Sequence, residues 1–273
     1  MQHAIKRYPV RHPLLKNYVK FFWEIDIEQI QLFHKLIPQR NINLRFNLSD
    51  TPHFITLNGK EQLLDDVFFS GLQDHFINAH IKLHGRVHIL GVCFLPEGFF
   101  PFLKIPVSEF KNQMVGTREV GFKLATTIRE KLIEAPTITE RLNILEDELA
   151  KLLCNNCGTS DSFRQVFKAL KHVDSPLQLS EFCQQNSIGM RTLERMYNKH
   201  VGISAKSFIT LNRFQNSLNQ ILYGDYSKLS DVAYDNGYFD QMHFIKDFKR
   251  FAGNTPKGFV TQSNSILQIG KFK

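Results

Sequence analysis

Residues 231–250 decide the fold of the C-terminal part of the chain: Asp231-Val-Ala-Tyr-Asp-Asn-Gly-Tyr-Phe-Asp-Gln-Met-His-Phe-Ile-Lys-Asp-Phe-Lys-Arg250. A short helical pattern that carries the small residue Ala233 leads into a tight turn at Gly237. A second helical pattern follows, with apolar residues at the spacing of one helix face: Phe244, Phe248 and Phe251. Because a small residue lets two helices cross closely, this stretch predicts a helix-turn-helix over about 228–251.

An internal repeat places a second unit of the same kind about 50 residues earlier in the chain. Cys183–Ser187 parallels Ala233–Gly237 at an offset of 50 residues. After one extra residue, Leu193–Lys199 parallels Phe244–Arg250 at an offset of 51. The repeat therefore predicts a first helix-turn-helix over about 177–200.

The helical period separates an inward face from an outward face in the second helix of each unit. In the first unit the inward residues are Met190, Leu193, Met196, Tyr197 and His200, and the outward residues are Arg191, Thr192, Glu194, Arg195 and Asn198. In the second unit the three phenylalanines face inward, which leaves more exposed Met242, His243, Lys246, Lys249 and Arg250. Arg and Lys donate to guanine in the major groove, and Met or Thr contacts the thymine methyl group, so both outward faces are suited to reading bases.

The segment between the two units is itself predicted to be a helix, over about 204–223. Its apolar stripe consists of Phe208, Leu211, Phe214, Leu218, Ile221 and Leu222. Twenty residues at about 1.5 Å each span about 30 Å, close to the roughly 34 Å between successive major-groove faces. One chain could thus present both second helices to one side of a duplex.

The charge of the chain is concentrated in this helical part. The formal net charge is +8, and residues 161–273 hold 15 basic and 9 acidic residues, whereas residues 1–160 hold 19 and 17. A net charge of +6 on the smaller part favours a polyanionic partner that binds there.

The first third of the chain has the period-two patterns of strands instead. Strand character appears over Val19–Ile27, Ile42–Leu48, Phe76–Leu83 and Val87–Leu95, and helical patterns follow from about Thr117. We therefore predict an α+β protein with a β-sandwich or barrel-like domain and following helices over 1–153, a linker over 154–160, and an all-α domain over 161–273. That last domain would contain both helix-turn-helix units and the long helix that joins them.

Residues 175–260 resemble the AraC/XylS-type DNA-binding domain, most densely over 231–250. The resemblance implies that Arg191, Arg195, Met242 and Lys246 face bases, with Gln241 and His243 beside them. It also places Arg213 at a basic position of the connecting helix. We expect phosphate contacts from Arg213, Lys206, Lys249 and Arg250. The sequence departs from the family pattern at Ser187, which replaces a turn glycine, at Gly189, which replaces a Ser or Thr cap, and at Lys246, where Arg is commoner.

The N-terminal part resembles an uncharacterised domain attached to some AraC-type regulators. The resemblance is carried by five short segments: Leu15–Trp23, Ile37-Pro38, Leu44–Phe46, Phe69–Gly71 and Phe94–Phe100. By analogy with that family, this domain would sense a signal, dimerise, or do both.

Two groups of residues keep other interpretations open. His80, His84 and His88, with His75 nearby, have the spacing of metal ligands along one strand, although a turn is expected at Gly85 and no carboxylate lies among them. The alternative function is therefore an N-terminal, metal-dependent, cupin-like enzyme fused to a DNA-binding domain. Cys154 and Cys157 have the spacing of a zinc or redox pair, but no second such pair occurs, so two ordinary thiols are the favoured interpretation.

The residues and both resemblances together predict a cytoplasmic transcription regulator. Members of this family most commonly activate transcription. We expect that the protein is not an enzyme and needs no metal or cofactor. No nucleophile elbow, P-loop or dinucleotide fingerprint occurs, and no segment approaches the roughly 18 apolar residues of a membrane span. The expected partners are double-stranded DNA, RNA polymerase, a small-molecule or protein effector at the N-terminal domain, and a second copy of the chain, but no membrane. Binding of RNA or anionic lipid by the basic face is the remaining alternative.

Overall fold

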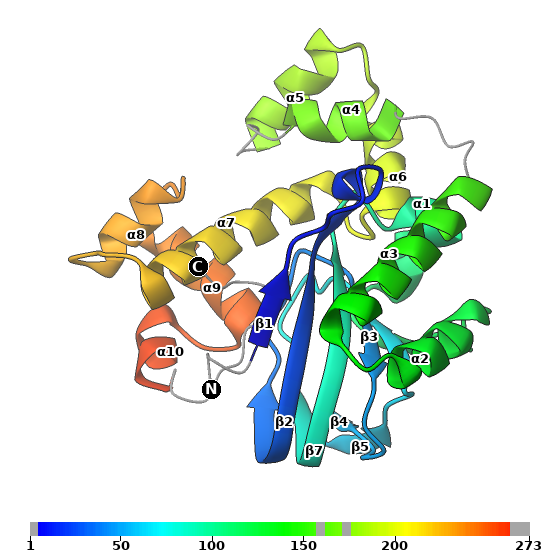
Figure 1. Cartoon of the computed structure of the whole chain (residues 1–273). Helices are drawn as coiled ribbons and strands as arrows, with labels where there is room; N and C mark the ends of the chain where they lie inside the picture. Colours follow the sequence, from blue (N-terminus) through cyan, green and yellow to red (C-terminus); the bar gives the residue numbers. More distant parts are fainter. Residues whose placement is uncertain (1–4, 157–161, 171–175, 263–273) are drawn as a thin grey trace.

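The computed structural model describes residues 5–156, 162–170 and 176–262 of the chain (Figure 1). Strands fill the first third and helices dominate from Leu124 onward, which confirms the predicted α+β class. In Figure 1 the sheet lies between helices α2 (Leu124–Glu134) and α3 (Ile138–Asn155) on one side and most of the C-terminal helices on the other. None of the helices described is both long enough and apolar enough to span a membrane.

The strands form one antiparallel sheet among the described residues. They are β1 (Ile5–Tyr8), β2 (Val19–Lys35), β3 (Asn43–Asn47), β4 (Phe54–Leu57), β5 (Lys60–Leu63), β6 (Val67–Ser70), β7 (Ala79–Phe94) and β8 (Met114–Gly116). The main path has the order β1-β2-β7-β3-β6-β8, and the β4–β5 hairpin branches from β7. The predicted β-rich domain therefore takes the form of a single branched sheet around two long central strands.

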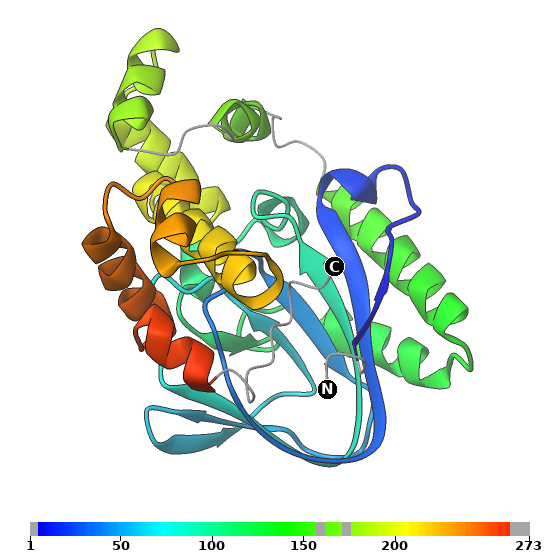
Figure 2. The same cartoon turned by 90° about the vertical axis from the view of Figure 1, so that its left-hand side faces the viewer.

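The expected turn at Gly85 is wrong, because β7 runs without a break through this residue. Gly85 has a φ of +79°, and the register between β2 and β7 shifts opposite it, between Ile27 and Ile30. Two residues of β2, Glu28 and Gln29, there oppose the single Arg86, so the bulge lies in β2 and Gly85 flanks it within a continuous β7. Glycine adopts the positive φ at little steric cost. Figure 2 shows that the long strands bend at the lower end of the sheet.

The long central strands are buried on both faces. Leu90 and Val92 belong to the main core beneath α2 and α3, whereas Trp23 and Ile89 belong to a second cluster on the opposite face. A Cβ at Gly91 would overlap the indole ring of Trp23. Glycine at this position is therefore what allows the indole to cross β7.

The C-terminal part is helical, and its two helix-turn-helix units are confirmed. Its helices are α4 (Ser162–Ala169), α5 (Pro176–Gln185), α6 (Met190–His200), α7 (Ala205–Tyr223), α8 (Leu229–Asp235), α9 (Gln241–Ala252) and α10 (Pro256–Gln262). α5 and α6 form the first unit, α8 and α9 the second, and α7 connects them. The Ser204 hydroxyl caps α7 by accepting a hydrogen bond from Ser207 N at 3.0 Å, and the predicted stripe is buried except for the half-buried Leu222.

The helical part packs directly on the β-rich part. The His200 ring at the end of α6 lies 4.4 Å from the ring of Phe163 and 4.4 Å from that of Phe100, in the short helix α1 (Phe100–Leu103). Gly202 has a φ of +92° and lies against Val107 of the 3-10 helix η3 (Val107–Phe110), so that a Cβ would be 2.8 Å from the Val107 carbonyl oxygen. One hydrophobic cluster accordingly extends from the sheet into both helix-turn-helix units.

Candidate nucleic-acid interface

The first recognition helix, α6, is held by its apolar face. Leu193 and Tyr197 are buried as predicted, and Arg191 and Arg195 are exposed on the opposite side. Met190 was expected to face inward, but its side chain is 39% exposed because it occupies the first position of the helix, beyond the packed turns. The exposed surface of α6 therefore begins one residue earlier than its apolar period indicates.

Glu194 does not belong to the outward face of α6 as expected. It is half-buried, and its carboxylate accepts a hydrogen bond from Ala205 N, at the start of α7, at 3.2 Å. A carboxylate at a helix N-terminus satisfies a backbone donor that has no partner within the helix. Glu194 thus fixes α6 relative to α7 instead of facing a ligand.

The turn of the first unit carries a strained residue. Ser187 has a φ of +52°, whereas the corresponding Gly237 of the second unit has a φ of +72°. A residue with a Cβ in this region is destabilised by roughly 1–2 kcal/mol relative to glycine. The departure from the family pattern at Ser187 therefore retains the turn geometry at a cost in stability.

The second recognition helix, α9, has a complete N-cap and a fully buried aromatic face. The Asp240 carboxylate accepts a hydrogen bond from His243 N at 2.7 Å, and the inward residues are all buried, as predicted: Phe244, Phe248 and Phe251. Gln241 and Lys246 are exposed, and Met242 is 73% exposed. These three side chains are therefore exposed at the surface of α9.

His243 and Arg213 are instead tied to a network beneath α9. His243 Nε2 lies 3.5 Å from Asp247 Oδ2, and Arg213 Nη2 lies 3.9 Å from the same oxygen. Arg213 also donates to the Gly237 carbonyl at 3.4 Å, and its guanidinium lies 5.1 Å from the centre of the Tyr238 ring. With only 11% of its side chain exposed, Arg213 braces the turn of the second unit and does not point into solvent.

The other three residues expected to bind phosphates are exposed: Lys206, Lys249 and Arg250. Lys206 lies in the first turn of α7, and the other two lie in the last turn of α9. The structure thus leaves basic side chains on both helices next to the candidate base-reading positions.

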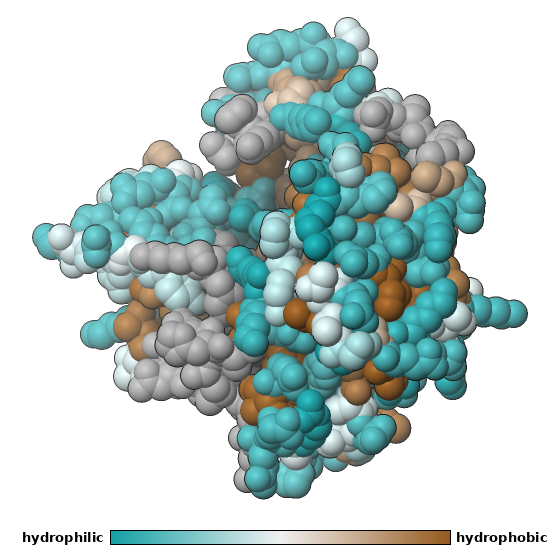
Figure 3. All heavy atoms as spheres, viewed as in Figure 1, coloured by the Kyte–Doolittle hydropathy of each residue, from teal (hydrophilic) through white to brown (hydrophobic). Residues whose placement is uncertain are grey.

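Sequence reasoning missed an apolar edge beside Met242. Phe239 is 88% exposed in the turn before α9, and Tyr234 of α8 is 62% exposed. The sequence did contain a signal for this exposed edge. Phe239 lies directly before the N-cap Asp240, at a position where no helix period requires an apolar residue. In the view of Figure 3 the surface over α8 is mostly hydrophilic.

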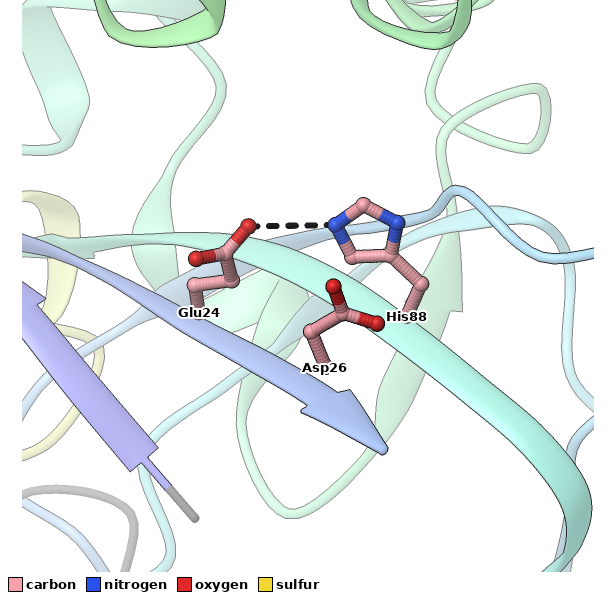
Figure 4. A group of neighbouring side chains, drawn as sticks. All are labelled: Glu24, Asp26 and His88. Atoms are coloured by element: carbon pink, nitrogen blue, oxygen red, sulfur yellow. Dashed lines mark hydrogen bonds and ion pairs between the residues drawn. The ribbon is translucent and has the colours of Figure 1, made fainter. Parts of the chain in front are cut away.

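The three histidines of the metal hypothesis do lie on one strand and one face, but they do not converge. Residues four apart on a strand are about 13 Å from each other, too far to share an ion. His88 instead meets two acidic groups of β2, Glu24 and Asp26, because Asp26 pairs with His88 in the register of β2 and β7 (Figure 4). Sequence reasoning did not foresee this cluster, since the two segments lie about 60 residues apart.

The Glu24 cluster is a hydrogen-bonded network with its own cation. Glu24 accepts from Tyr8 Oη at 2.9 Å, its Oε1 lies 3.1 Å from His88 Nε2, and Arg141 Nη1 is 3.9 Å from the same oxygen. Burial alone would raise the pKa of Glu24, but the hydrogen bonds from His88 and Tyr8 outweigh it and lower the pKa. Arg141 thus supplies a positive charge beside the Glu24 carboxylate.

The cysteine pair can be described only in part. Cys154 is exposed near the end of α3, and Cys157 lies outside the described residues. Cys93 and Cys183 are buried free thiols.

Two known families match separate parts of the chain. Residues 10–116 match a family described as "Domain of unknown function (DUF6597)", and residues 182–262 match one described as "Helix-turn-helix domain". The second match covers both recognition helices.

Individual relatives match over less than half of the chain. The chain is 27% identical over 86 residues to the HTH-type transcriptional regulator ExsA of Pseudomonas aeruginosa, covering 32% of this chain and 31% of that protein. It is 29% identical over 82 residues to the HTH-type transcriptional activator RhaS of Yersinia pestis, covering 30% of each. The chain thus spans about a third of the length of these curated relatives. Among solved structures, ToxT from Vibrio cholerae O395 aligns over 97% of this chain and 100% of its own, with 9% identity and a TM-score of 0.44.

Proposed function

We propose that this chain, in which an AraC-type helix-turn-helix domain over residues 182–262 follows a domain of unknown function over residues 10–116, is a sequence-specific DNA-binding transcription regulator. The observation that carries the proposal is the pair of exposed, basic recognition helices joined by one helix of 19 residues. At about 1.5 Å per residue, α7 is about 28 Å long. That length is close to the roughly 34 Å between successive major-groove faces of one duplex side.

The first unit reads bases through α6. Arg191 and Arg195 lie one helical turn apart and are both exposed, so their guanidinium groups can enter one groove together. A guanidinium that donates two hydrogen bonds to guanine O6 and N7 is the commonest specific contact in the major groove. We therefore assign guanine recognition to these two arginines.

The second unit reads bases through the start of α9. Gln241 offers an amide that pairs with adenine, and Lys246 offers a donor for guanine. Met242, together with the neighbouring Phe239, offers an apolar surface for the methyl group of thymine. His243 contributes to base reading indirectly, because it lies next to these residues while its ring is directed toward Asp247.

Phosphate binding falls to the exposed cations of α7 and α9. Lys206, Lys249 and Arg250 would position the two units on the backbone, and Arg213 would act through the turn that it braces. The net charge of +6 on residues 161–273 supports a polyanionic partner for this part of the chain.

The N-terminal domain would control this binding. It contacts α7, where Gln215 Nε2 donates to the Pro38 carbonyl and Arg40 Nη1 donates to Asn212 Oδ1 at 3.4 Å. An effector bound in this domain, or a second copy of the chain, could thereby change how the recognition helices are presented. Contact with RNA polymerase, activation of transcription and a cytoplasmic location complete the proposal.

Selection of duplexes from random and genomic DNA by the full-length protein tests the function. We expect one enriched operator with two half-sites about one helical turn apart. Equal binding of every duplex, of RNA and of anionic vesicles would contradict the proposal.

A methyl-deletion experiment on that operator then tests the assignment of Met242. Uracil replaces thymine, one position at a time, and removes only the methyl group. We expect about fourfold weaker binding at the thymine that Met242 contacts, in line with the loss of one buried apolar carbon. In Met242→Ala the same replacement should have no effect, whereas in Met190→Ala, the matched change in the other recognition helix, the fourfold loss should remain.

A further inference from the structure

Strand β3 buries an arginine on the face of the sheet opposite the main core. Leu44 and Phe46 point into that core, so Arg45, between them, points to the other side. Only 6% of Arg45 is exposed. Its guanidinium carbon lies 5.6 Å from the centre of the Trp23 ring and 5.6 Å from that of Phe68.

This guanidinium makes no hydrogen bond or ion pair with any residue that the structure describes. Its Nε atom is completely buried and has no partner there. Burial lowers the pKa of Arg45, but only to about 10, so the group is charged at neutral pH. An isolated buried charge is destabilising by several kcal/mol, and two aromatic faces offset about 1–2 kcal/mol of that cost.

The groups that surround Arg45 in the described part of the chain supply no negative charge. Burial raises the pKa of the Cys93 thiol to about 12, which leaves it neutral. Arg40 is a second, half-buried cation on this side, and its described partner is the uncharged amide of Asn212. Positive charge therefore accumulates here without a described carboxylate at ion-pair distance from Arg45 or Arg40.

A small polar cavity lies beside Arg45. Its volume is about 30 Å³, and besides Arg45 its polar lining consists of Gln39, Asn41, Asn43, Ser70 and Gln73. The side chains of Gln39, Ser70 and Gln73 form no hydrogen bond with any described residue. The cavity therefore has room for a small polar group beside the Arg45 guanidinium.

Two asparagines of the lining are held in place by hydrogen bonds within the protein, and Asn43 Nδ2 donates to the Asn41 carbonyl at 3.4 Å. Trp23 Nε1 donates to Asn43 Oδ1 at 3.1 Å, and Asn41 Nδ2 donates to the Phe94 carbonyl at 2.6 Å. These hydrogen bonds fix the positions of the side chains of Asn41 and Asn43. Amide and hydroxyl donors that surround a buried guanidinium are the arrangement that binds carboxylate and phosphate oxygens.

We propose that this cavity is an anion site, in which Arg45, with Ser70 and the amides of Gln39 and Gln73, binds the carboxylate or phosphate group of a small molecule. The ligand supplies the negative charge that Arg45 lacks within the described protein. This inference deepens the proposed function, because it names the chemical class of the effector and rests on that function for its regulatory meaning. The binding itself requires no DNA.

Trp23 provides a direct readout, because it is the single tryptophan of the chain and its ring lies against Arg45. Full-length protein is titrated with sodium acetate and, separately, with inorganic phosphate, while sodium chloride keeps the ionic strength constant. We expect a saturable change in Trp23 fluorescence with at least one of the two anions. A response to acetate alone identifies a carboxylate ligand, and a response to phosphate alone identifies a phosphate ligand.

Variants assign the response to Arg45. Arg45→Met should weaken the apparent affinity by about 10- to 100-fold, as expected for the loss of a charged hydrogen-bond donor. Lys60→Met removes one positive charge at an exposed position and should leave the response unchanged. Arg45→Lys retains the charge but loses the planar donors, so an intermediate affinity is expected.

The proposal is overturned if the parent protein shows no saturable response to either anion, or if Arg45→Met responds as the parent does. The titration of the parent and of Arg45→Lys still decides the question if Arg45→Met does not fold. Failure of DNA selection together with a saturable anion response would overturn the regulator and leave the anion site standing. Enrichment of an operator without a saturable anion response would overturn the anion site and leave the regulator standing.

Discussion

Gly253, the residue that ends the second recognition helix, lies directly against the ring of Phe76 from the N-terminal domain. Gly253 has a φ of +69°, and a Cβ at this position would be 2.6 Å from Phe76 Cδ1. Phe76 N also donates to the carbonyl oxygen of Arg250, in the last turn of α9, at 2.7 Å. The loop before β7 is therefore docked on the end of the helix proposed to enter the major groove.

Replacing Gly253 by alanine tests how tightly this contact is packed. Gly253→Ala should lower the free energy of unfolding by about 1–3 kcal/mol, because the new Cβ is disfavoured at positive φ and also displaces Phe76. Gly237→Ala is the matched control: Gly237 has a φ of +72° with nothing near its missing Cβ, so about 1 kcal/mol is expected. Urea unfolding measures the free energy of unfolding of both variants. Equal losses of stability would show that the Phe76 ring moves aside without an energetic penalty.

The strained turn of the first helix-turn-helix predicts a stabilising substitution. Ser187→Gly should raise the free energy of unfolding by about 1 kcal/mol, since φ at this residue is +52° and glycine removes the steric conflict. The opposite change in the second unit, Gly237→Ser, should lower it by a similar amount. Thermal or urea unfolding of the two variants checks this, and a Ser187→Gly variant less stable than the parent would contradict it.

The placement of Arg213 predicts that its loss affects stability more than the salt dependence of DNA binding. Arg213→Ala leaves the buried Asp247 without its guanidinium partner, so the free energy of unfolding should fall by about 1–3 kcal/mol. Lys206→Ala, at an exposed position, should leave stability unchanged but reduce the slope of log K against log salt by about 1. If Arg213→Ala reduced the slope equally without loss of stability, Arg213 would be a phosphate contact after all.

His200 predicts a loss of stability in mild acid. Burial, assisted by the nearby Lys199, lowers the pKa of His200 to about 4, whereas the unfolded chain has a value near 6.5. Below pH 6.5 the unfolded state therefore binds a proton that the folded state does not, and stability falls until about pH 4. His200→Phe should flatten this part of the curve, whereas His84→Phe, an exposed position, should not. Part of the slope should remain, because burial also lowers the pKa of His53 to about 4.

Local patterns were enough to predict the helical part, because each of its elements is specified by nearby residues. The stripe of α7 and the phenylalanines of α9 have a helical period, and burial of that face produces the observed packing. Positions at helix ends were harder to predict. Met190 and Glu194 follow the same period as their neighbours, but one lies beyond the packed turns and the other caps α7.

Residues separated by long stretches of chain could not be placed in the same way. His88 meets Glu24 through the register of β2 and β7, and a shift of one residue would have turned each side chain to the opposite face. Gly85 could not be placed from its sequence either, since a glycine can end a strand or lie within a continuous one opposite a bulge, and only the pairing with β2 distinguishes the two.

The sequence by itself determined the α+β class, the duplicated helix-turn-helix, the length of its connecting helix and the location of the positive charge. All of these follow from periodicity and composition within short segments. Only the tertiary structure decided that Arg213 is turned inward, that Phe76 rests on the end of α9 and that Arg45 is buried beside a polar cavity without a carboxylate. Burial and pairing are properties of the surroundings of a side chain, and for these residues the surroundings come from distant parts of the chain.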